Sequence, residues 1–331
     1  VAHRGSPLIL TGATGTGKST TLIESAIDRI QSGVDPESIL ILAYGRERAS
    51  EIRDAIVIAS DKTVHEPVAR TFHALAFSIL SMQSGDAYRE TVLISGAEQE
   101  SFIRSLLQGN IDDAVTWWPA DLRAGGEATM GEPLLTQGFI RELRDLMMRA
   151  TERGLTPSQL REKGQRLQER FWAPAAQFWQ QYLEVSAGMD TGAGDAKMRI
   201  DPSEIINSAI AHLKNNPDLL ADLRKRFTTI MVDEFHETDP AQRRLLELLA
   251  GNDLVLVVDP ASAIGRFRGS DPDGANQYLE RTLPIATTIT LVTNHRGSPA
   301  KYAVELRSEA EEAQYIAYQI KRAHLMEGIA Y

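Results

Sequence analysis

Apolar residues in the first part of the chain fall into short runs, and each run is followed by a longer stretch in which apolar positions recur every three or four residues. Runs rich in Leu, Ile and Val are typical of strands, and the wider spacing is typical of helices. The pattern predicts strands at 7–11, 38–43 and 68–71, and helices from Ser19, over 46–58 and over 72–82. Strands that alternate with helices in this way indicate a parallel α/β sheet.

The pattern changes near residue 97, and apolar positions then keep only the helical spacing as far as about residue 227. Helices are predicted at 97–107, 137–153, 157–170, 173–185 and 202–212. Strand-like runs return at 229–232, 254–258 and 287–292. We therefore expect a parallel α/β sheet that is interrupted by an all-helical insertion and then resumes.

The turn between the first strand and the first helix contains every fixed position of the pattern Gly-x-x-x-x-Gly-Lys-Ser/Thr. Its residues are Gly12, Ala13, Thr14, Gly15, Thr16, Gly17, Lys18 and Ser19, followed by Thr20. Glycines between a strand and a helix let backbone N–H groups surround phosphates, and the helix N-terminus adds partial positive charge. We predict that residues 12–20 bind ATP, with Lys18 at the β- and γ-phosphates and the Ser19 hydroxyl on Mg²⁺.

A second motif ends the apolar run 229–232 with two adjacent carboxylates, Asp233 and Glu234. After a phosphate loop, such a pair predicts that Asp233 holds Mg²⁺ and that Glu234 is the general base for the attacking water. More residues separate Lys18 from Asp233 in the sequence than a compact P-loop core contains between these two motifs. This separation again indicates an insertion.

The composition of the chain limits the kinds of site that it can contain and the compartment and partners that are expected. The chain of 331 residues has no cysteine, so Cys-based zinc sites and disulfides are excluded, and a cytoplasmic location is expected. No apolar run is long enough to cross a bilayer, so no membrane partner is expected. The net charge of −10 argues against a general affinity for nucleic acid, so any DNA contact needs a local basic channel.

Further stretches resemble the ordered motifs of a known family. These stretches are Ile41-Leu42-Ala43-Tyr44 with Ala49, Arg70-Thr71-Phe72-His73-Ala74, the box 232–239, the segment from Asp259 to Gly269, and Asn294-His295-Arg296. Together with the phosphate loop, they resemble the N-terminal motor half of superfamily 1A DNA helicases of the UvrD, Rep and RecB type. Within that group the chain looks closest to the actinobacterial AdnA/AdnB helicase–nuclease subunits. The resemblance covers nearly the whole chain, including 138–146 in the helical insertion.

This resemblance implies roles for several residues. Arg296 would contact the γ-phosphate. Thr71, Phe72 and His73 would lie along the path of single-stranded DNA, and Phe267 with Arg268 would contact the strand. Two alternatives stay open from the residues alone: Phe267 can be a core aromatic, and Thr71 can be a helix N-cap.

The resemblance also implies a domain plan and an activity. Residues 1–90 and 226–290 would form the first RecA-like ATPase domain, 91–225 the helical insertion, and 291–331 the beginning of a second RecA-like domain. The implied protein is an ATP-dependent translocase or helicase, moving 3′ to 5′ in DNA repair or double-strand-break processing. Its partners would be single-stranded and duplex DNA and a second helicase–nuclease subunit. The family's motifs V and VI are missing, so we expect a truncated sequence, and no nuclease motif of the RecB type is present.

Some positions depart from the family pattern. His236 and Ser262 replace glutamines, Gly265 replaces a DNA-stacking tyrosine, and 43–45 departs from motif Ia. We expect ATP to alter DNA affinity only weakly as a result. The alternative is a non-motor ATP-binding or DNA-guiding scaffold subunit. A different P-loop ATPase, such as an AAA-type remodeller, is disfavoured by the ordered motifs.

The helical insertion carries two further groups of residues. Its basic side chains could guide duplex DNA, but interleaved acids favour a plain solvated face. These basic residues are Arg141, Arg144, Arg149, Arg153, Arg161, Lys163, Arg166 and Arg170. The four tryptophans are predicted to be core residues rather than base-stacking platforms; they are Trp117, Trp118, Trp172 and Trp179.

Overall fold

The computed structural model describes residues 3–59, 68–82, 91–123, 132–191, 198–200, 204–296 and 304–327. The chain divides into two compact units, 1–293 and 294–331, which are described separately.

Within the described residues, all strands belong to the first unit. They are β1 (Leu8–Gly12), β2 (Ile39–Ala43), β3 (Ala69–Thr71), β4 (Thr91–Leu93), β5 (Met198–Ile200), β6 (Thr229–Val232), β7 (Asp253–Val258) and β8 (Thr287–Leu291). The α-helices are α1 (Lys18–Gln31), α2 (Arg46–Ala59), α3 (Phe72–Ser81), α4 (Gly96–Asp112), α5 (Ala120–Arg123), α6 (Gln137–Glu152), α7 (Pro157–Leu167), α8 (Trp172–Thr191), α9 (Ile205–Asn215), α10 (Pro217–Arg226), α11 (Pro240–Leu249), α12 (Pro272–Thr282) and α13 (Glu309–Glu327). Short 3₁₀ turns are η1 (Pro36–Ser38), η2 (Glu132–Leu135), η3 (Phe235–Glu237), η4 (Pro260–Ser262) and η5 (Gly265–Arg268).

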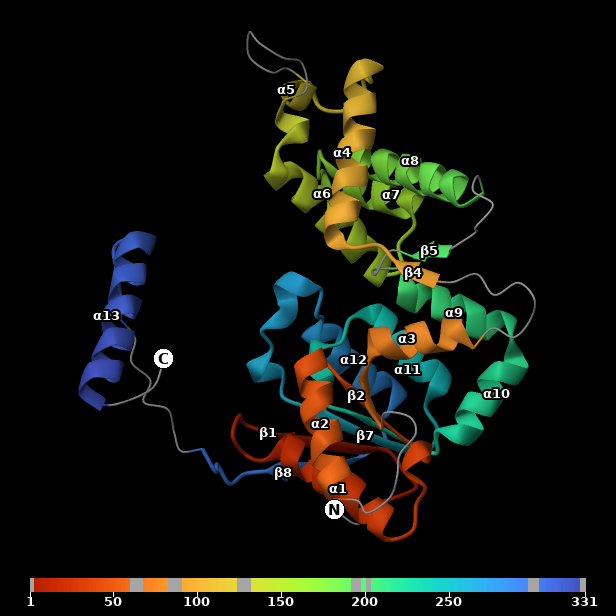
Figure 1. Cartoon of the computed structure of the whole chain (residues 1–331), viewed down its shortest axis with the longest axis vertical. Helices are drawn as coiled ribbons and strands as arrows, with labels where there is room; N and C mark the ends of the chain where they lie inside the picture. Colours follow the sequence, from red (N-terminus) through yellow and green to blue (C-terminus); the bar gives the residue numbers. More distant parts are fainter. Residues whose placement is uncertain are drawn as a thin grey trace. The chain divides into compact units, whose positions relative to one another are not determined.

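Six strands form one parallel sheet in the order β3-β2-β6-β7-β1-β8 (Figure 1). The predicted parallel α/β class is therefore confirmed, and the strand order is that of a RecA-like sheet. Every residue of β2 is buried, as expected for a parallel strand covered on both faces. Leu40 and Leu42 enter one core, while Ile39, Ile41 and Ala43 enter the other.

Each core belongs to one face of the sheet. The first core is completed by apolar residues of α3, α9, α10, α11 and α12, and the second by those of α1 and α2. The phosphate loop and the ends of β6 and β7 lie at the carboxyl edge of this sheet. Ligands bind at this edge in open parallel α/β folds.

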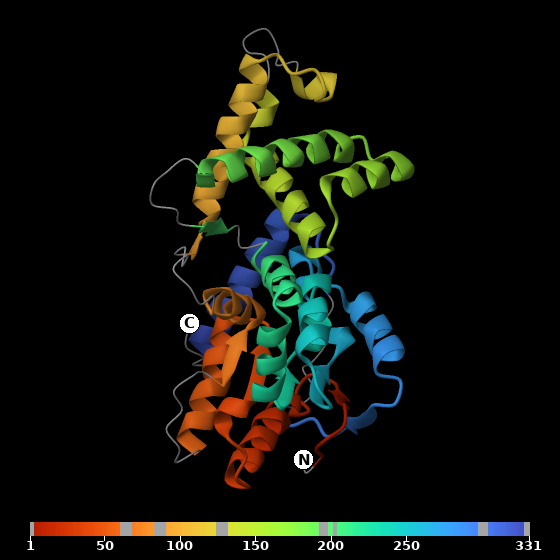
Figure 2. The same cartoon turned by 90° about the vertical axis from the view of Figure 1, so that its right-hand side faces the viewer.

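A helical subdomain built from α4, α6, α7 and α8 has a third core of its own, to which the short α5 and η2 also contribute (Figure 2). Trp118 and Trp179 are buried in this core, and Trp117 and Trp172 pack against it. The prediction that the tryptophans are core residues is confirmed.

The expectation of an all-helical insertion is corrected at one point. Residues 198–200 form β5, which pairs in parallel with β4 in a separate two-stranded sheet. Such a short strand has no periodicity of its own, because its formation depends on a partner more than a hundred positions away in the sequence. The pattern also missed α10, although Pro217 stands at the first helical position, where proline is favoured.

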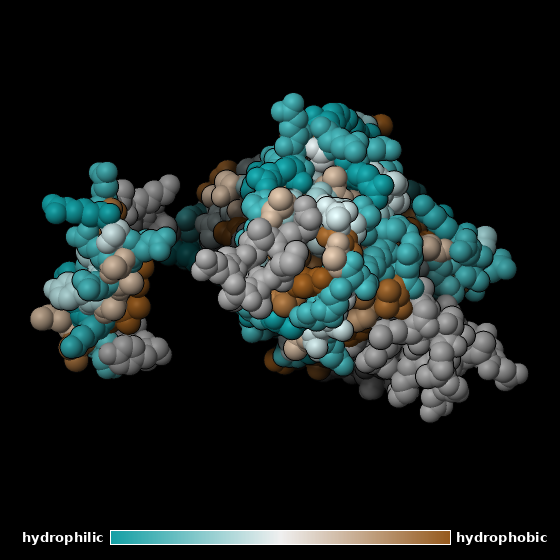
Figure 3. Space-filling model, turned by 90° about the horizontal axis from the view of Figure 1, so that it is seen from above, coloured by the Kyte–Doolittle hydropathy of each residue, from teal (hydrophilic) through white to brown (hydrophobic). Residues whose placement is uncertain are grey.

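In the second unit, α13 begins after Ser308, whose hydroxyl accepts a hydrogen bond from the Glu311 N–H. Its larger apolar side chains, including Ile316 and Ile320 one turn apart, are exposed. Figure 3 shows hydrophobic residues side by side on this helix. In the described part of the chain, no helix combines the length and apolar character that a bilayer-crossing segment requires.

Candidate nucleotide-binding site

The loop between β1 and α1 has a backbone that depends on its glycines. Gly15 and Gly17 have φ values of 86° and 82°, in the left-handed region that favours glycine. At Gly12, an added Cβ would lie 2.6 Å from the Leu291 carbonyl oxygen and 2.7 Å from Thr16 Oγ1. No side chain in the described part of the chain caps the start of α1, so the N–H groups of its first turn are available for an anion.

Lys18 lies folded across this loop. Its Nζ donates to the carbonyl oxygens of Gly12 and Ala13, at 2.8 and 3.1 Å, and to Asp259 Oδ2 at 2.8 Å. Both side chains of the Lys18–Asp259 ion pair are largely buried. Asp259 directly follows β7, so the pair joins the phosphate loop to the end of a neighbouring strand.

Ser19 and Asp233 meet although they are far apart in the sequence. Ser19 Oγ donates to Asp233 Oδ1 at 2.9 Å, and the backbone N–H of Asp233 donates to the Leu42 carbonyl in β2. The other carboxylate oxygen, Oδ2, accepts from Arg48 Nε at 3.0 Å. Sequence reasoning missed Arg48. The available signal was its place just after β2, whose carboxyl end neighbours that of β6.

Glu234 is held in an unusual conformation beside this cluster. Its φ and ψ of 52° and 45° are left-handed, which is uncommon for a non-glycine residue and costs free energy. The side chain remains accessible to solvent. Removal of water by the surrounding protein, and then the carboxylates of Asp233 and Glu237, raise the pKa of Glu234.

His236 and Ser262, which the resemblance suggests are replacements of glutamines, contact each other. His236 is buried, and burial is the main factor that lowers its pKa. Its Nδ1 accepts the Asp259 N–H at 3.0 Å, so Nε2 carries the proton of the neutral ring and lies 3.3 Å from Ser262 Oγ. The imidazole therefore links the chain after β6 to the turn after β7, and it fixes the backbone of Asp259.

At Gly265, where the resemblance implies the loss of a DNA-stacking tyrosine, neighbouring side chains pack closely against the backbone. Its N–H and that of Ile264 donate to the buried Glu237 carboxylate. The space for a Cβ is already filled by side-chain atoms of Glu237, Ser270 and Tyr44. A tyrosine at this position would require those groups to move, which local sequence could not reveal.

The three consecutive residues assigned to the DNA path differ in their burial and contacts. Thr71 is the N-cap of α3, because its Oγ1 accepts the Ala74 N–H at 3.2 Å. Phe72 is buried in the core below α3, so its assignment to DNA contact is corrected to packing. His73 is exposed beside it.

The other assigned positions are only partly described. The side chains of Phe267 and Arg268 lie outside the described residues, although their backbone forms η5. Arg296 belongs to the second unit, where its N–H donates to Asn294 Oδ1 at 2.9 Å. Thr20 is exposed in the first turn of α1.

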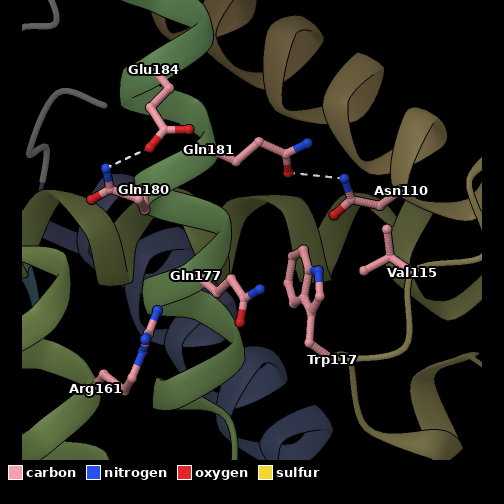
Figure 4. A pocket seen from close by; sticks show the side chains of 8 residues that line it. All are labelled: Asn110, Val115, Trp117, Arg161, Gln177, Gln180, Gln181 and Glu184. Atoms are coloured by element: carbon pink, nitrogen blue, oxygen red, sulfur yellow. Dashed lines mark hydrogen bonds between the residues drawn. The ribbon is translucent and has the colours of Figure 1, made fainter.

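A separate pocket of about 350 Å³ lies in the helical subdomain, lined by α4, α7, α8 and the segment that follows α4. Figure 4 shows the Trp117 ring between Gln177 and Asn110. Much of the polar lining is internally satisfied, since Asn110 donates to Gln181 at 2.9 Å and Gln180 to Glu184 at 2.8 Å. None of its lining residues belongs to the phosphate loop or the acidic motif.

The fold and the glycine loop define a P-loop protein with a RecA-like sheet. A family model described as the UvrD/REP helicase N-terminal domain matches residues 1–282, so the chain belongs to this family. It is 26% identical to DNA helicase II of Escherichia coli over 303 residues, which cover 90% of this chain and 37% of that protein.

Two further relatives show the same partial coverage. The ATP-dependent DNA helicase UvrD1 of Mycobacterium leprae is 25% identical over 324 residues, covering 90% of this chain and 37% of the relative. The ATP-dependent DNA helicase PcrA of Leuconostoc citreum is 25% identical over 301 residues, covering 88% and 35%. The chain spans little more than a third of the length of these curated relatives.

Proposed function

We propose that this chain is the N-terminal motor portion of an ATP-dependent DNA translocase or helicase. The observation that carries the proposal is the 2.9 Å contact between Ser19 and Asp233, which joins the phosphate loop to the acidic motif at the carboxyl edge of the sheet. Membership of the family, and relatives that are named DNA helicases, support the same activity. In this proposal 1–90 and 226–290 form the first RecA-like domain, 91–225 the insertion, and 291–331 the start of the second domain.

The donor set at this edge fits Mg²⁺. The Ser19 hydroxyl and the Asp233 carboxylate are hard oxygen ligands, and Mg²⁺ commonly takes one or two such protein groups together with phosphates and water. Bound there, Mg²⁺ would neutralise charge on the phosphates of ATP. Lys18 would exchange the carboxylate of Asp259 for phosphate oxygens.

Glu234 is the proposed general base. Its carboxyl is accessible and adjoins Asp233, and a raised pKa makes it a better proton acceptor than an ordinary glutamate. It would orient the attacking water and accept its proton. The left-handed backbone sets the direction of this side chain after the buried strand β6. Arg296 of the second unit is proposed, on resemblance, to stabilise charge at the γ-phosphate.

The finer features of the proposal rest on resemblance. They are 3′ to 5′ movement, a role in DNA repair or double-strand-break processing, and a second subunit of the AdnA/AdnB kind. Single-stranded DNA would run past Thr71, His73, Phe267 and Arg268. Thr71 ends β3 and His73 lies in the first turn of α3. Phe267 and Arg268 lie in η5, which comes after β7, and this placement after the ends of sheet strands supports such a path.

The alternative function is a non-motor ATP-binding or DNA-guiding scaffold. The close packing around Gly265 supports it, because an aromatic side chain at that position would require side-chain atoms of Glu237, Ser270 and Tyr44 to move. Hydrolysis that single-stranded DNA does not stimulate would indicate the scaffold.

The test is ATP hydrolysis and nucleotide binding by the full-length protein, with and without single-stranded DNA. Lys18→Ala should abolish hydrolysis and weaken nucleotide binding, because it removes the cation that faces the phosphates. Glu234→Gln should retain binding and stop turnover, because it removes only the base. The control is Lys225→Ala, which removes an exposed lysine of α10. Parent-level hydrolysis in both site variants would contradict the assignment.

A further inference from the structure

The Arg48 guanidinium contacts the carboxylate of Asp233, the group that is proposed to hold the metal. It stands in the first turn of α2, and its Nε is 3.0 Å from Asp233 Oδ2. The Asp233 side chain is 0% exposed, whereas that of Arg48 is 31% exposed. The guanidinium therefore reaches inward from a partly solvated position to a fully buried anion.

Among the described residues, both oxygens of Asp233 have partners, and one of these partners is charged. Oδ1 accepts from the Ser19 hydroxyl, and Oδ2 accepts from Arg48. A buried carboxylate without a counter-ion is strongly destabilising, and a guanidinium remains protonated in proteins. In this structure, Arg48 is the cation that compensates Asp233.

Arg48 also contacts a second carboxylate. Its Nη1 donates to Glu51 Oε2 at 2.7 Å, and the Glu51 side chain is 64% exposed. Glu51 lies one helical turn further along α2, so the guanidinium keeps an anionic partner if it leaves Asp233. Its flexible stem allows this movement without a change in the helix.

We propose that Arg48 and a divalent cation compete for Asp233, so that Mg²⁺ binds in exchange for the guanidinium. The proposal rests on the proposed function in taking Asp233 as the metal-holding residue. Both cations need the same buried carboxylate, and Asp233 has one negative charge. Arg48 therefore lowers the affinity of this site for free metal. It acts through Asp233 and does not itself bind the metal.

The test measures metal binding without nucleotide. The probe is Mn²⁺, which prefers the same oxygen ligands as Mg²⁺ and is detected by electron paramagnetic resonance as the free ion. Arg48→Ala should bind Mn²⁺ about tenfold more tightly than the parent, within the usual range of coupling between two competing interactions. Arg48→Lys, which keeps the charge without the guanidinium geometry, should lie between the two.

The matched control is Arg53→Ala on the same helix. Arg53 pairs with its neighbours Ser50 and Asp54, and this variant should bind Mn²⁺ as the parent does. Adding Asp233→Asn to Arg48→Ala should remove the gained affinity, which locates the metal at Asp233. Mg²⁺ should also raise the unfolding temperature of Arg48→Ala more than that of the parent.

Equal Mn²⁺ affinity in the parent, Arg48→Ala and Arg48→Lys would overturn the competition. A gain that survives Asp233→Asn would also overturn it. Lys18→Ala separates the two proposals: loss of nucleotide binding in that variant supports the proposed function whatever the Mn²⁺ result. If Lys18→Ala binds nucleotide normally, the proposed function fails, while Mn²⁺ binding still decides the competition at Asp233.

Discussion

At the residue scale, charged groups of the candidate site are paired across strand ends rather than within one segment. Lys18 meets Asp259 at 2.8 Å, and Arg48 meets Asp233 at 3.0 Å. Each pair therefore joins a group from the loop or helix after one strand to a carboxylate after another. Phosphate oxygens of a bound nucleotide would compete with Asp259 for Lys18. In the same way, Mg²⁺ would compete with Arg48 for Asp233.

This pairing makes a prediction for Asp259→Asn. The variant removes the anion that holds Lys18 but keeps the backbone N–H that His236 binds. Nucleotide affinity should rise by about five- to tenfold, because a charge-assisted hydrogen bond no longer has to be exchanged. Titration with a fluorescent ATP analogue measures it. Weaker binding would show that Asp259 helps to hold the nucleotide instead of competing with it.

At the element scale, the end of α6 attaches the helical subdomain to the α/β domain through polar contacts. Its last carbonyls accept side-chain donors: Asn207 binds Thr151 at 2.7 Å, and Arg244 binds Glu152 at 3.3 Å. The Glu152 carboxyl is pressed against Gly269 after η5, and its Oε2 is buried without a hydrogen-bond partner among the described residues. Burial, and then the Asp239 carboxylate, raise the pKa of Glu152 to about 7.

This environment predicts that Glu152→Gln stabilises the protein at high pH. A raised pKa in the folded state means that the stability from this group is complete below about pH 4.5 and is lost as the pH rises through about 7. The positive charges of Arg149 and Arg153 limit this rise in the pKa of Glu152, and the carboxylate of Asp145 adds to it. At pH 8 the variant should unfold with a free energy about 1–3 kcal/mol higher than the parent, and at pH 5 the difference should nearly vanish.

Urea unfolding at both pH values measures this difference. Glu142→Gln, an exposed change on the same helix, is the control and should leave the stability within about 0.5 kcal/mol at either pH. A variant that is less stable than the parent at pH 8 would show that the charged carboxylate has a stabilising partner there.

At the scale of the whole molecule, the described residues of the first unit form three hydrophobic cores. Two flank the six-stranded sheet, and the third lies inside the helical subdomain and shares no residue with them. The subdomain meets the sheet domain through the polar contacts of α6 rather than through a shared apolar core. Interfaces of this kind resemble those between separate domains.

This division predicts that the helical subdomain unfolds separately from the nucleotide-binding domain. The four tryptophans all pack in or against the third core, so tryptophan fluorescence reports only that subdomain. ATP with Mg²⁺ at about 100 times its dissociation constant should stabilise the sheet domain by about 2.7 kcal/mol. In the unfolding curve followed by far-ultraviolet circular dichroism, the part that comes from the sheet domain should therefore move to higher stability. The unfolding transition followed by tryptophan fluorescence should not move.

Lys18→Ala is the control, since it should remove the shift seen by circular dichroism. An equal shift of both transitions by nucleotide would show that the two subdomains unfold as one cooperative unit.

The sequence by itself determined the features that local spacing controls. Apolar periodicity located the principal strands and helices, and the parallel sheet followed from their alternation. The glycine loop identified the phosphate-binding turn, because its function depends on backbone conformation over a few consecutive residues. The stretches from Asp233 to Asp239 and from Asn294 to Arg296 indicated the family, which the family model then established.

Only the tertiary structure decided which distant groups meet. The pairing of β5 with β4, the reach of Arg48 to Asp233, and the Lys18–Asp259 ion pair all join segments that are far apart in the sequence. The filled space at Gly265 and the burial of Phe72 likewise depend on neighbours from other elements. Periodicity specifies which face of an element is apolar, but contact requires the strand order, and that order is fixed by packing the whole sheet between its two layers of helices.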